Sequence, residues 1–191
     1  METPNLNILD LKKKSFETKR LLLVPFSLRY KDFFYNCSKN KKITKYTTII
    51  GSIEKPTLTD VEKYIKKTKR NKKGLFYTIL LKENKTPIGC VGINQIDFKN
   101  KTCTTFSWLN TDFWSNGYMS EAKQKILDII FNKLKLNRIE TNCDPNNKKI
   151  IKHLLSLGFK KEGKLRENYV LNGKFVDNLI FAQLKKEYKK N

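Results

Sequence analysis

The residues most able to do chemistry lie in the run W-S-N-G-Y-M-S-E-A at positions 114–122. Its glycine can adopt a positive φ angle, and a loop that turns there into a helix can direct several backbone N–H groups at a phosphate. Neither the P-loop pattern G-x-x-x-x-G-K-[ST] nor the dinucleotide pattern G-x-G-x-x-G occurs in the chain. The run therefore indicates either another kind of anion-binding turn or an ordinary connection.

The elements on both sides of this loop decide between the two interpretations. The preceding run C-T-T-F-S-W-L-N, positions 103–110, is rich in β-branched and aromatic residues and predicts a strand. The apolar positions after the loop recur at helical spacing, at Ala122, Ile126, Ile129 and Ile130. Lys123 is expected on another face of this helix. A strand, a glycine loop and a helix place the positive end of a helix dipole beside the strand's end, which suits a pyrophosphate.

A second strand-to-helix junction follows downstream. Residues 138–143 predict a strand, and the run D-P-N-N at 144–147 indicates a helix start, with Asp or Asn as the cap and Pro145 at the first helical position. Four apolar residues are expected to face inward: Ile150, Ile151, Leu154 and Leu155. The helix should end at Gly158. Two such junctions in succession can form one cleft between them.

The other elements need only a coarse outline. Strands are expected at 20–24, 76–81 and 88–97, and a helix at 28–38. The pattern T-D-V-E at 59–62 predicts a capping box that starts a helix ending near Lys69. Asn172 and Gly173 favour a type I′ turn, which predicts a C-terminal hairpin with strands at 169–171 and 175–184.

Five runs, in one order along the chain, carry a family resemblance. They are T-K-R-L-L-L-V-P-F at 18–26, F-W-S-N-G-Y-M-S-E-A at 113–122, L-N-R-I-E at 136–140, C-D-P-N-N at 143–147 and L-L-S-L-G-F-K-K-E-G at 154–163. Together they resemble the GNAT-superfamily N-acetyltransferases, and most closely the RimJ/RimL subgroup of ribosomal-protein N-terminal acetyltransferases. The resemblance covers about residues 16–188 of the chain.

This resemblance implies an α+β fold of the acyl-CoA N-acyltransferase type. Its mixed, mostly antiparallel central sheet would be splayed at the cofactor site and flanked by helices. Residues 16–191 would form a single domain after a loose N-terminal arm of residues 1–15. The walls of the acceptor site would lie at 44–56 and at the hairpin turn 172–173.

The resemblance also implies acetyl-CoA as co-substrate and acetyl transfer to a primary amine by direct attack in a ternary complex. Leu109 and Asn110 would pair main-chain groups with the pantetheine arm, much as an added strand does. The backbone of five loop residues would contact the pyrophosphate: Asn116, Gly117, Tyr118, Met119 and Ser120. Asn147 would contact the cofactor at the start of the next helix, and it is the one weak candidate for a catalytic residue. No metal is implied.

Four departures from the family pattern bear on catalysis. Met119 stands where the family often has a small residue, but it need not obstruct the phosphates if its side chain points into the core. Thr104 replaces a common glutamate, Ile150 a serine and Leu154 a tyrosine, so the usual base and acid are absent from their usual places. An α-amine with a pKa near 7.7–8.0 needs a base less than a lysine amine near 10.4 does.

These departures favour a peptide or protein N-terminus as the acceptor, with a small-molecule amine such as a polyamine or an antibiotic next. Two alternatives stay open. The chain could be a catalytically weak acyl-CoA-binding protein, or, on charge alone, a basic nucleic-acid-binding or ribosome-binding module.

Four further side chains attract attention, each with a plainer interpretation. His153 is the single histidine, and its neighbours on the apolar face predict a boundary or surface position rather than a catalytic one. Cys143 is expected to be a small buried thiol, although it lies near the predicted cleft. Glu121 should complement the helix dipole. Asp177 is either structural or on the acceptor side.

The composition excludes several classes of protein. With 191 residues, 39% of them hydrophobic and 30% charged, the chain is expected to fold as one globular domain. No run approaches the roughly 20 apolar residues that cross a bilayer, and the N-terminus lacks the pattern of a signal peptide. The four cysteines show neither C-x-x-C pairing nor metal-ligand spacing. These features predict a cytoplasmic protein with reduced thiols and no membrane contact.

The charge of the chain is strongly positive: 40 Lys+Arg stand against 18 Asp+Glu, a net charge of +22. Such a surface attracts phosphate, which would suit nucleic acid or the ribosome. Nearly all of the positive charge is lysine spread along the chain, however, whereas specific phosphate and base recognition relies on arginine. General basicity is therefore favoured. Nucleic-acid or ribosome contact and a homodimer both stay open.

Overall fold

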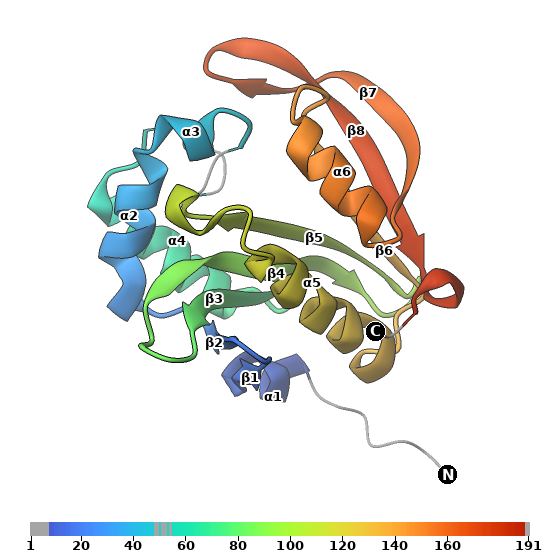
Figure 1. The fold of residues 1–191 in the computed structure, drawn as a ribbon, viewed down its shortest axis with the longest axis horizontal. Coiled ribbons are helices and arrows are strands. Elements are labelled where there is room, and N and C mark those ends of the chain that lie inside the picture. Colours follow the sequence, from blue (N-terminus) through green and yellow to red (C-terminus); the bar gives the residue numbers. More distant parts are fainter. Residues whose placement is uncertain (1–7, 48–49, 51–52, 54, 190–191) are drawn as a thin grey trace.

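The computed structural model describes residues 8–47, 50, 53 and 55–189 (Figure 1). Its strands form one eight-stranded sheet in the order β1-β2-β3-β4-β5-β6-β8-β7. All neighbouring strands pair antiparallel except β5 and β6, which are parallel. The predicted mixed, mostly antiparallel sheet is therefore confirmed.

The described elements have the following bounds. The strands are β1 (Phe16–Glu17), β2 (Leu21–Pro25), β3 (Leu75–Leu81), β4 (Pro87–Asp97), β5 (Thr102–Leu109), β6 (Arg138–Cys143), β7 (Lys160–Leu171) and β8 (Lys174–Leu184). The helices are α1 (Ile8–Lys13), α2 (Lys31–Ser38), α3 (Lys41–Thr44), α4 (Leu58–Arg70), α5 (Tyr118–Asp128) and α6 (Lys148–Ser156). A π-helical turn, Ile129–Lys133, extends α5, and 3-10 turns lie at Leu28–Tyr30, Thr111–Phe113 and Lys185–Glu187.

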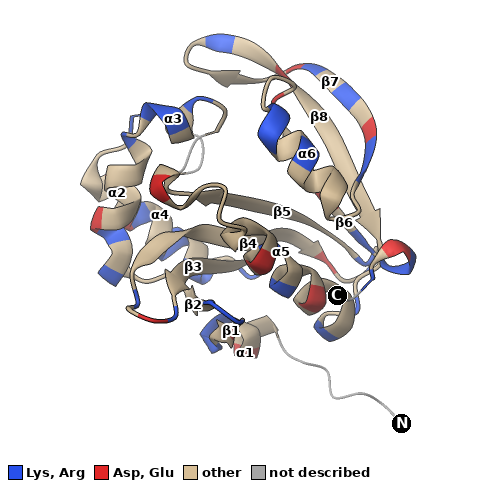
Figure 2. Ribbon diagram, in the orientation of Figure 1, with Lys and Arg blue, Asp and Glu red and all other residues tan. Residues whose placement is uncertain are grey.

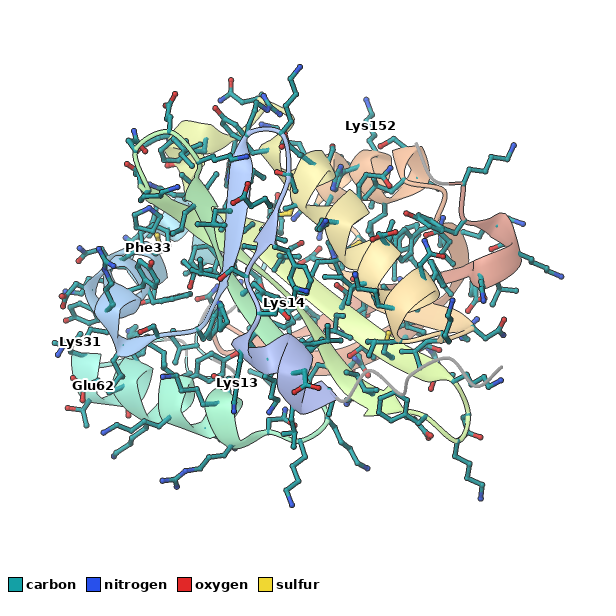
Figure 3. The ribbon with its side chains drawn as sticks, turned by 90° about the horizontal axis from the view of Figure 1, so that it is seen from below. Lys13, Lys14, Lys31, Phe33, Glu62 and Lys152 are labelled. Carbon is teal, nitrogen blue, oxygen red and sulfur yellow. The ribbon has the colours of Figure 1, made fainter. Side chains whose placement is uncertain are left out.

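Helices cover both faces of the sheet (Figure 1). One apolar cluster joins α1, α5 and α6 to the sheet, and a second joins α2 and α4 to it. Alternate residues of β5 belong to different clusters, Leu109 to the first and Trp108 to the second, because successive side chains of a strand point to opposite faces. Across α2 and α4, the Lys31 Nζ lies 2.7 Å from a Glu62 carboxylate oxygen (Figure 3).

The described part of the N-terminal segment begins with a helix at residue 8. Residues 8–13 form α1, in which Leu11 is fully buried and its carbonyl accepts a hydrogen bond from the Tyr77 hydroxyl at 2.7 Å. The loose arm was predicted for residues 1–15, of which residues 1–7 lie outside the described residues. The packed core thus includes part of that arm.

The ends of the elements follow the expected local chemistry, with one shift. Helix α4 starts in a capping box, but its members are Thr57 and Asp60 rather than the predicted Thr59 and Glu62. The Thr57 hydroxyl accepts from the Asp60 N–H at 3.2 Å, and the Thr57 N–H donates back to the Asp60 carboxylate at 2.9 Å. The prediction was wrong by two residues because two overlapping threonine patterns offer the same chemistry.

The C-terminal hairpin is confirmed at its turn. Asn172 and Gly173 both have positive φ angles, 52° and 73°, as a type I′ turn requires. Strand β7 is longer than predicted, since it begins at Lys160 directly after α6. Most of its side chains are exposed, so its sequence lacks the apolar alternation that predicts a strand.

Candidate functional site

The sheet opens between its two parallel strands. Residues 102–104 of β5 pair with 138–140 of β6, and no pair joins the two strands beyond Thr104 in the described part of the chain. Strand β6 continues to Cys143 paired only with β8, while β5 continues to Leu109 paired only with β4. The predicted splay is therefore present, and it lies between β5 and β6 (Figure 1).

Strand β5 presents main-chain groups to this opening. The Asn110 N–H donates to the Ile88 carbonyl in β4 at 2.8 Å, and the pairing directions of an antiparallel strand alternate. The N–H and C=O groups of Leu109 and Ser107 therefore point to the β6 side. The Leu109 carbonyl already accepts from the Trp114 Nε1 at 2.9 Å. The Leu109 N–H thus points to the opening, whereas the Asn110 N–H is engaged with β4. Ser107, which the sequence did not indicate, also presents its main chain to the opening.

The loop after β5 leaves a row of backbone donors without an acceptor. Helix α5 begins at Tyr118, and Gly117 before it has a φ of +76° and no side-chain cap. The first N–H groups of a helix have no acceptor within it. Within the described chain, the N–H groups of residues 115–120 have no hydrogen-bond partner, whereas the Glu121 N–H donates to the Gly117 carbonyl at 3.1 Å. Met119 packs against the core, so its side chain leaves this row open.

An ion pair between Arg20, which precedes β2, and Glu121 in α5 holds this loop in place. The Glu121 carboxylate accepts from the Thr18 hydroxyl at 2.6 Å, and from the backbone N–H and the Nε of Arg20 at 2.7 Å each. Arg20 in turn donates to the Asn116 carbonyl at 3.0 Å and lies 4.4 Å from the centre of the Tyr118 ring. Burial opposes ionisation of Glu121, but the hydrogen bonds from Thr18 and Arg20 outweigh it and lower its pKa. Glu121 thus holds the loop in place.

Removing the interactions of Arg20 should loosen the loop without unfolding the protein. We expect Arg20→Ala to weaken acetyl-CoA binding about fivefold to tenfold, because a partly exposed charged hydrogen-bond network contributes on the order of 1 kcal/mol. Arg29→Ala is the control, since Arg29 stacks on Tyr30 and not on the loop. Calorimetric titration with acetyl-CoA measures both variants. Equal affinities for the two would show that Arg20 does not position the loop.

On the opposite side of the opening, Asn147 caps α6. Its side-chain carbonyl accepts from the Ile150 N–H at 3.3 Å, and its own N–H donates to the Asp144 carbonyl at 3.0 Å. Pro145 was wrongly predicted to be the first helical residue, because the cap is Asn147 and the helix begins at Lys148. Leu155 was also predicted to face inward, but it is 52% exposed, since the apolar stripe of this short helix turns away from it.

His153 in α6 and Cys143 at the end of β6 both lie at the opening between β5 and β6. The His153 Nδ1 lies 3.4 Å from the Ser120 hydroxyl, and burial together with the nearby Lys123 lowers its pKa to about 4. This imidazole is neutral at pH 7 and a weak base. Cys143 is buried as predicted, and burial together with the Asp144 charge raises its pKa to about 11. Neither group is poised to take or give a proton near pH 7.

Lys123 is buried, contrary to the prediction from the sequence. It was expected on a polar face of the helix, yet it is 1% exposed, and burial lowers its pKa to about 7. Its Nζ donates to the Thr105 hydroxyl at 3.0 Å, beside the point where β5 and β6 part. The signal was present, since Lys123 is spaced i, i+3, i+4 and i+7 with the apolar positions 126, 127 and 130.

A cavity of about 1060 Å³ occupies the opening. Its walls come from α3 and the residues after it, from the end of β5 through the loop into α5, from the end of β6 into α6, and from the hairpin residues Tyr169 and Asn178. Six of the predicted cofactor residues line it: Leu109, Gly117, Tyr118, Met119, Ser120 and Asn147. Asn110 and Asn116 do not line the cavity, although each is adjacent in sequence to a residue that does.

Two other residues of the sequence analysis lie away from the cavity. Thr104, where relatives carry a glutamate, belongs to the paired part of β5, and its hydroxyl donates to the Asn94 carbonyl at 3.3 Å. Asp177 accepts from the Glu167 N–H at 2.9 Å and pairs with Lys164 at 2.6 Å, which ties β8 to the irregular middle of β7. Asp177 is therefore structural.

The described residues contain neither a metal-binding cluster nor a membrane-spanning helix. No group of three or more His, Cys, Asp or Glu side chains there is arranged to hold a metal ion. No described helix combines the length and the apolar character that crossing a membrane requires. All four cysteines are buried as free thiols. Of the expected acceptor wall at 44–56, residues 48–49, 51–52 and 54 lie outside the described residues.

The chain matches a known protein family along most of its length. A family described as the acetyltransferase (GNAT) domain matches residues 20–160. The chain is 34% identical over 171 residues to the uncharacterized N-acetyltransferase p20 of Bacillus licheniformis, across 90% of this chain and 96% of the relative. It is 28% identical over 97 residues to the ribosomal-protein-serine acetyltransferase of Escherichia coli, across 51% of this chain and 54% of the relative.

Solved structures share the fold. The spermidine N-acetyltransferase from Vibrio cholerae, in complex with CoA and spermine, superposes with a TM-score of 0.79 at 20% identity, over 88% of this chain and 98% of that one. An acetyltransferase of the GNAT family from Bacillus anthracis gives a TM-score of 0.78 at 21% identity, over 91% of this chain and 100% of that one. These likenesses confirm the predicted fold class.

Proposed function

Since the chain belongs to the GNAT acetyltransferase family and is an N-acetyltransferase, we propose that it acetylates the α-amine of a peptide or protein N-terminus. GNAT enzymes use acetyl-CoA, and we propose direct attack of the amine in a ternary complex. The observation that supports acetyl-CoA as co-substrate is the row of backbone N–H groups at the start of α5 that have no partner in the described chain, beside the opening between β5 and β6. The cytoplasmic location stays a prediction of the sequence.

The residues around the opening fit the co-substrate. Acetyl-CoA supplies an activated acetyl thioester when bound. The N–H groups of residues 116–120 would hold its pyrophosphate at the positive end of the α5 dipole. The main chain of Leu109 and Ser107 would pair with the amide-rich pantetheine arm. Asn147, whose carbonyl oxygen caps α6, has a side-chain N–H group left for the cofactor.

The acceptor is proposed from the protonation states in the cavity. The shifted pKa values among the residues lining it all move away from 7: His153 falls to about 4, Cys143 rises to about 11, and burial raises that of Tyr169 above 10. An attacking amine must lose its proton, and these groups offer little help near pH 7. An α-amine, with a pKa near 7.7–8.0, is partly neutral without help. Orientation would then supply most of the rate, which can amount to about 7–11 kcal/mol.

Two other functions are each supported by a specific observation. A small-molecule amine, such as a polyamine or an antibiotic, would also fit a cavity of about 1060 Å³. A catalytically weak acyl-CoA-binding protein is motivated by Thr104, Ile150 and Leu154, which replace the family's usual base and acid. We rank both below the peptide acceptor.

The test is release of free thiol from acetyl-CoA on mixing with a panel of amines. The panel contains a peptide with a free N-terminus, the same peptide blocked at its N-terminus but with an internal lysine, spermidine and an aminoglycoside. We expect turnover with the first peptide, at a rate that follows deprotonation of its α-amine between about pH 7 and 9. Acetyl-CoA that raises the melting temperature while no amine is acetylated would instead establish the binding-only function.

A further inference from the structure

The cavity walls carry an excess of positive charge. Five lysines line the cavity: Lys42, Lys45, Lys148, Lys149 and Lys152. The single carboxylate among the described lining residues is Asp144, which is 6% exposed and accepts from the Asn146 N–H at 2.7 Å. The ratio of five to one exceeds that of the whole chain, where 40 basic residues face 18 acidic ones. The excess at the cavity is therefore more than the general basicity of the protein.

These lysines are not neutralised within the chain. The ion pairs of the described residues involve other cations, such as Lys31, Arg138 and Lys164. None of the five cavity lysines belongs to an ion pair in the described part of the protein, and all five are exposed. Lys152, for example, projects from α6 at the edge of the molecule (Figure 3). Their field therefore extends into the cavity and its entrance.

The lysines lie on two separate walls. Lys148, Lys149 and Lys152 belong to α6, and the Lys149 Nζ lies 5.6 Å from the Trp114 ring in the loop that precedes α5. This wall lies beside the loop that would hold the phosphates of acetyl-CoA under the proposed function. Lys42 belongs to α3 and Lys45 follows it, and both line the cavity. Figure 1 shows α3 across from α6. Figure 2 shows blue Lys or Arg segments on the ribbons of both α3 and α6. The wall of α3 is thus left for the acceptor.

This arrangement decides between acceptors of opposite charge. A polyamine carries several ammonium groups, and its binding would place them beside lysines with one buried carboxylate to receive them, which costs affinity. A peptide with carboxylates close behind its N-terminus would meet Lys42 and Lys45 with complementary charge. Resting on the proposed function, we infer that the acceptor is a peptide or protein N-terminus followed by acidic residues.

Three peptides that differ in charge alone test the inference. They share the first residue, and carry Asp, Asn or Lys at each of the next three positions. We expect kcat/KM to fall from the acidic to the neutral to the basic peptide, by about tenfold in total at low salt, and the range to narrow as salt screens the charges. Spermidine, included as a small polycation, should be acetylated more slowly than the acidic peptide.

Reversing the charges of Lys42 and Lys45 tests whether these two side chains cause the preference for the acidic peptide. The double variant Lys42→Glu, Lys45→Glu should lose the preference for the acidic peptide while its KM for acetyl-CoA stays unchanged. The control is Lys72→Glu, Lys73→Glu, which makes the same change of net charge on an exposed turn outside the cavity lining. It should keep the preference.

The failures are distinguishable. Equal rates for the three peptides, a faster rate with the basic peptide or spermidine, or equal effects of the two double variants would overturn the acidic acceptor and leave the N-acetyltransferase proposal standing. Absence of thiol release with every peptide, although acetyl-CoA binds, would overturn the proposed function and this inference with it.

Discussion

Gly117→Val is expected to abolish acetyl-CoA binding. Gly117 has a φ of +76°, and this left-handed conformation costs a residue with a Cβ about 1–2 kcal/mol, more for a β-branched one. A valine would move the backbone out of this region and turn the N–H groups at the start of α5 away from the phosphates. The loss comes from the backbone and not from crowding, since the nearest heavy atom to an added Cβ is an Arg20 nitrogen at 3.4 Å. Calorimetric titration with acetyl-CoA measures the effect.

Gly173→Val is the matched control for backbone strain. Gly173 has nearly the same φ, +73°, and no heavy atom lies within 4 Å of an added Cβ there. It belongs to the hairpin turn between β7 and β8, so the variant should lose a similar amount of stability and still bind acetyl-CoA. If the Gly117 variant folds and keeps its affinity for acetyl-CoA, then the loop does not hold the pyrophosphate.

Lys123→Met is expected to stabilise the protein by about 2 kcal/mol at pH 7. The fall of the Lys123 pKa from 10.5 to about 7 corresponds to a destabilisation on the order of 5 kcal/mol, at about 1.4 kcal/mol for each pH unit. Replacing this buried amine, which has no opposite charge beside it, by an apolar side chain of similar length removes part of this cost. The hydrogen bond to Thr105 is lost, but the Thr105 hydroxyl keeps its bond to the Gly92 carbonyl at 2.8 Å. Urea unfolding measures the change.

The same substitution should change how stability depends on pH. Unfolded, Lys123 keeps its proton up to pH 10.5, whereas folded it releases the proton above about pH 7. Between these values the unfolded state binds more protons, so the free energy of unfolding rises with pH. Below pH 7 both states hold the proton and the cost is complete. The advantage of Lys123→Met over the unaltered protein should therefore be largest below pH 7 and shrink toward pH 10.5.

Lys125→Met separates this effect from a general loss of positive charge. Lys125 lies on the same helix but is half-buried, with its Nζ 5.9 Å from the centre of the Phe16 ring. Its substitution removes the same charge from a less buried position and should not reproduce the gain in stability of Lys123→Met. A Lys123 variant that is less stable than the unaltered protein at pH 7, or that shows the same pH dependence, would contradict a neutral, poorly solvated Lys123.

Local features of the fold could be predicted from the sequence because their causes are local. Asn172 and Gly173 define their turn through their own φ angles, and Gly158 ends α6 in the same way, with a φ of +86°. Gly117 marks the start of α5 for the same reason. The order of the motifs indicated the family, and with it a central sheet splayed at the cofactor site; that the opening lies between the parallel strands β5 and β6 came from the structure.

Tertiary structure decided what depends on neighbours distant in the sequence. The burial of Lys123 follows from packing α5 against β5, where Thr105 receives its Nζ. The role of Glu121 depends on Thr18 and Arg20, about a hundred residues earlier in the chain. The direction of each main-chain group in β5 follows from its register with β4, which assigns Leu109 to the opening and the Asn110 N–H to Ile88. Propensity and spacing describe a residue and its near neighbours, whereas register and burial are settled only when separate segments pack together.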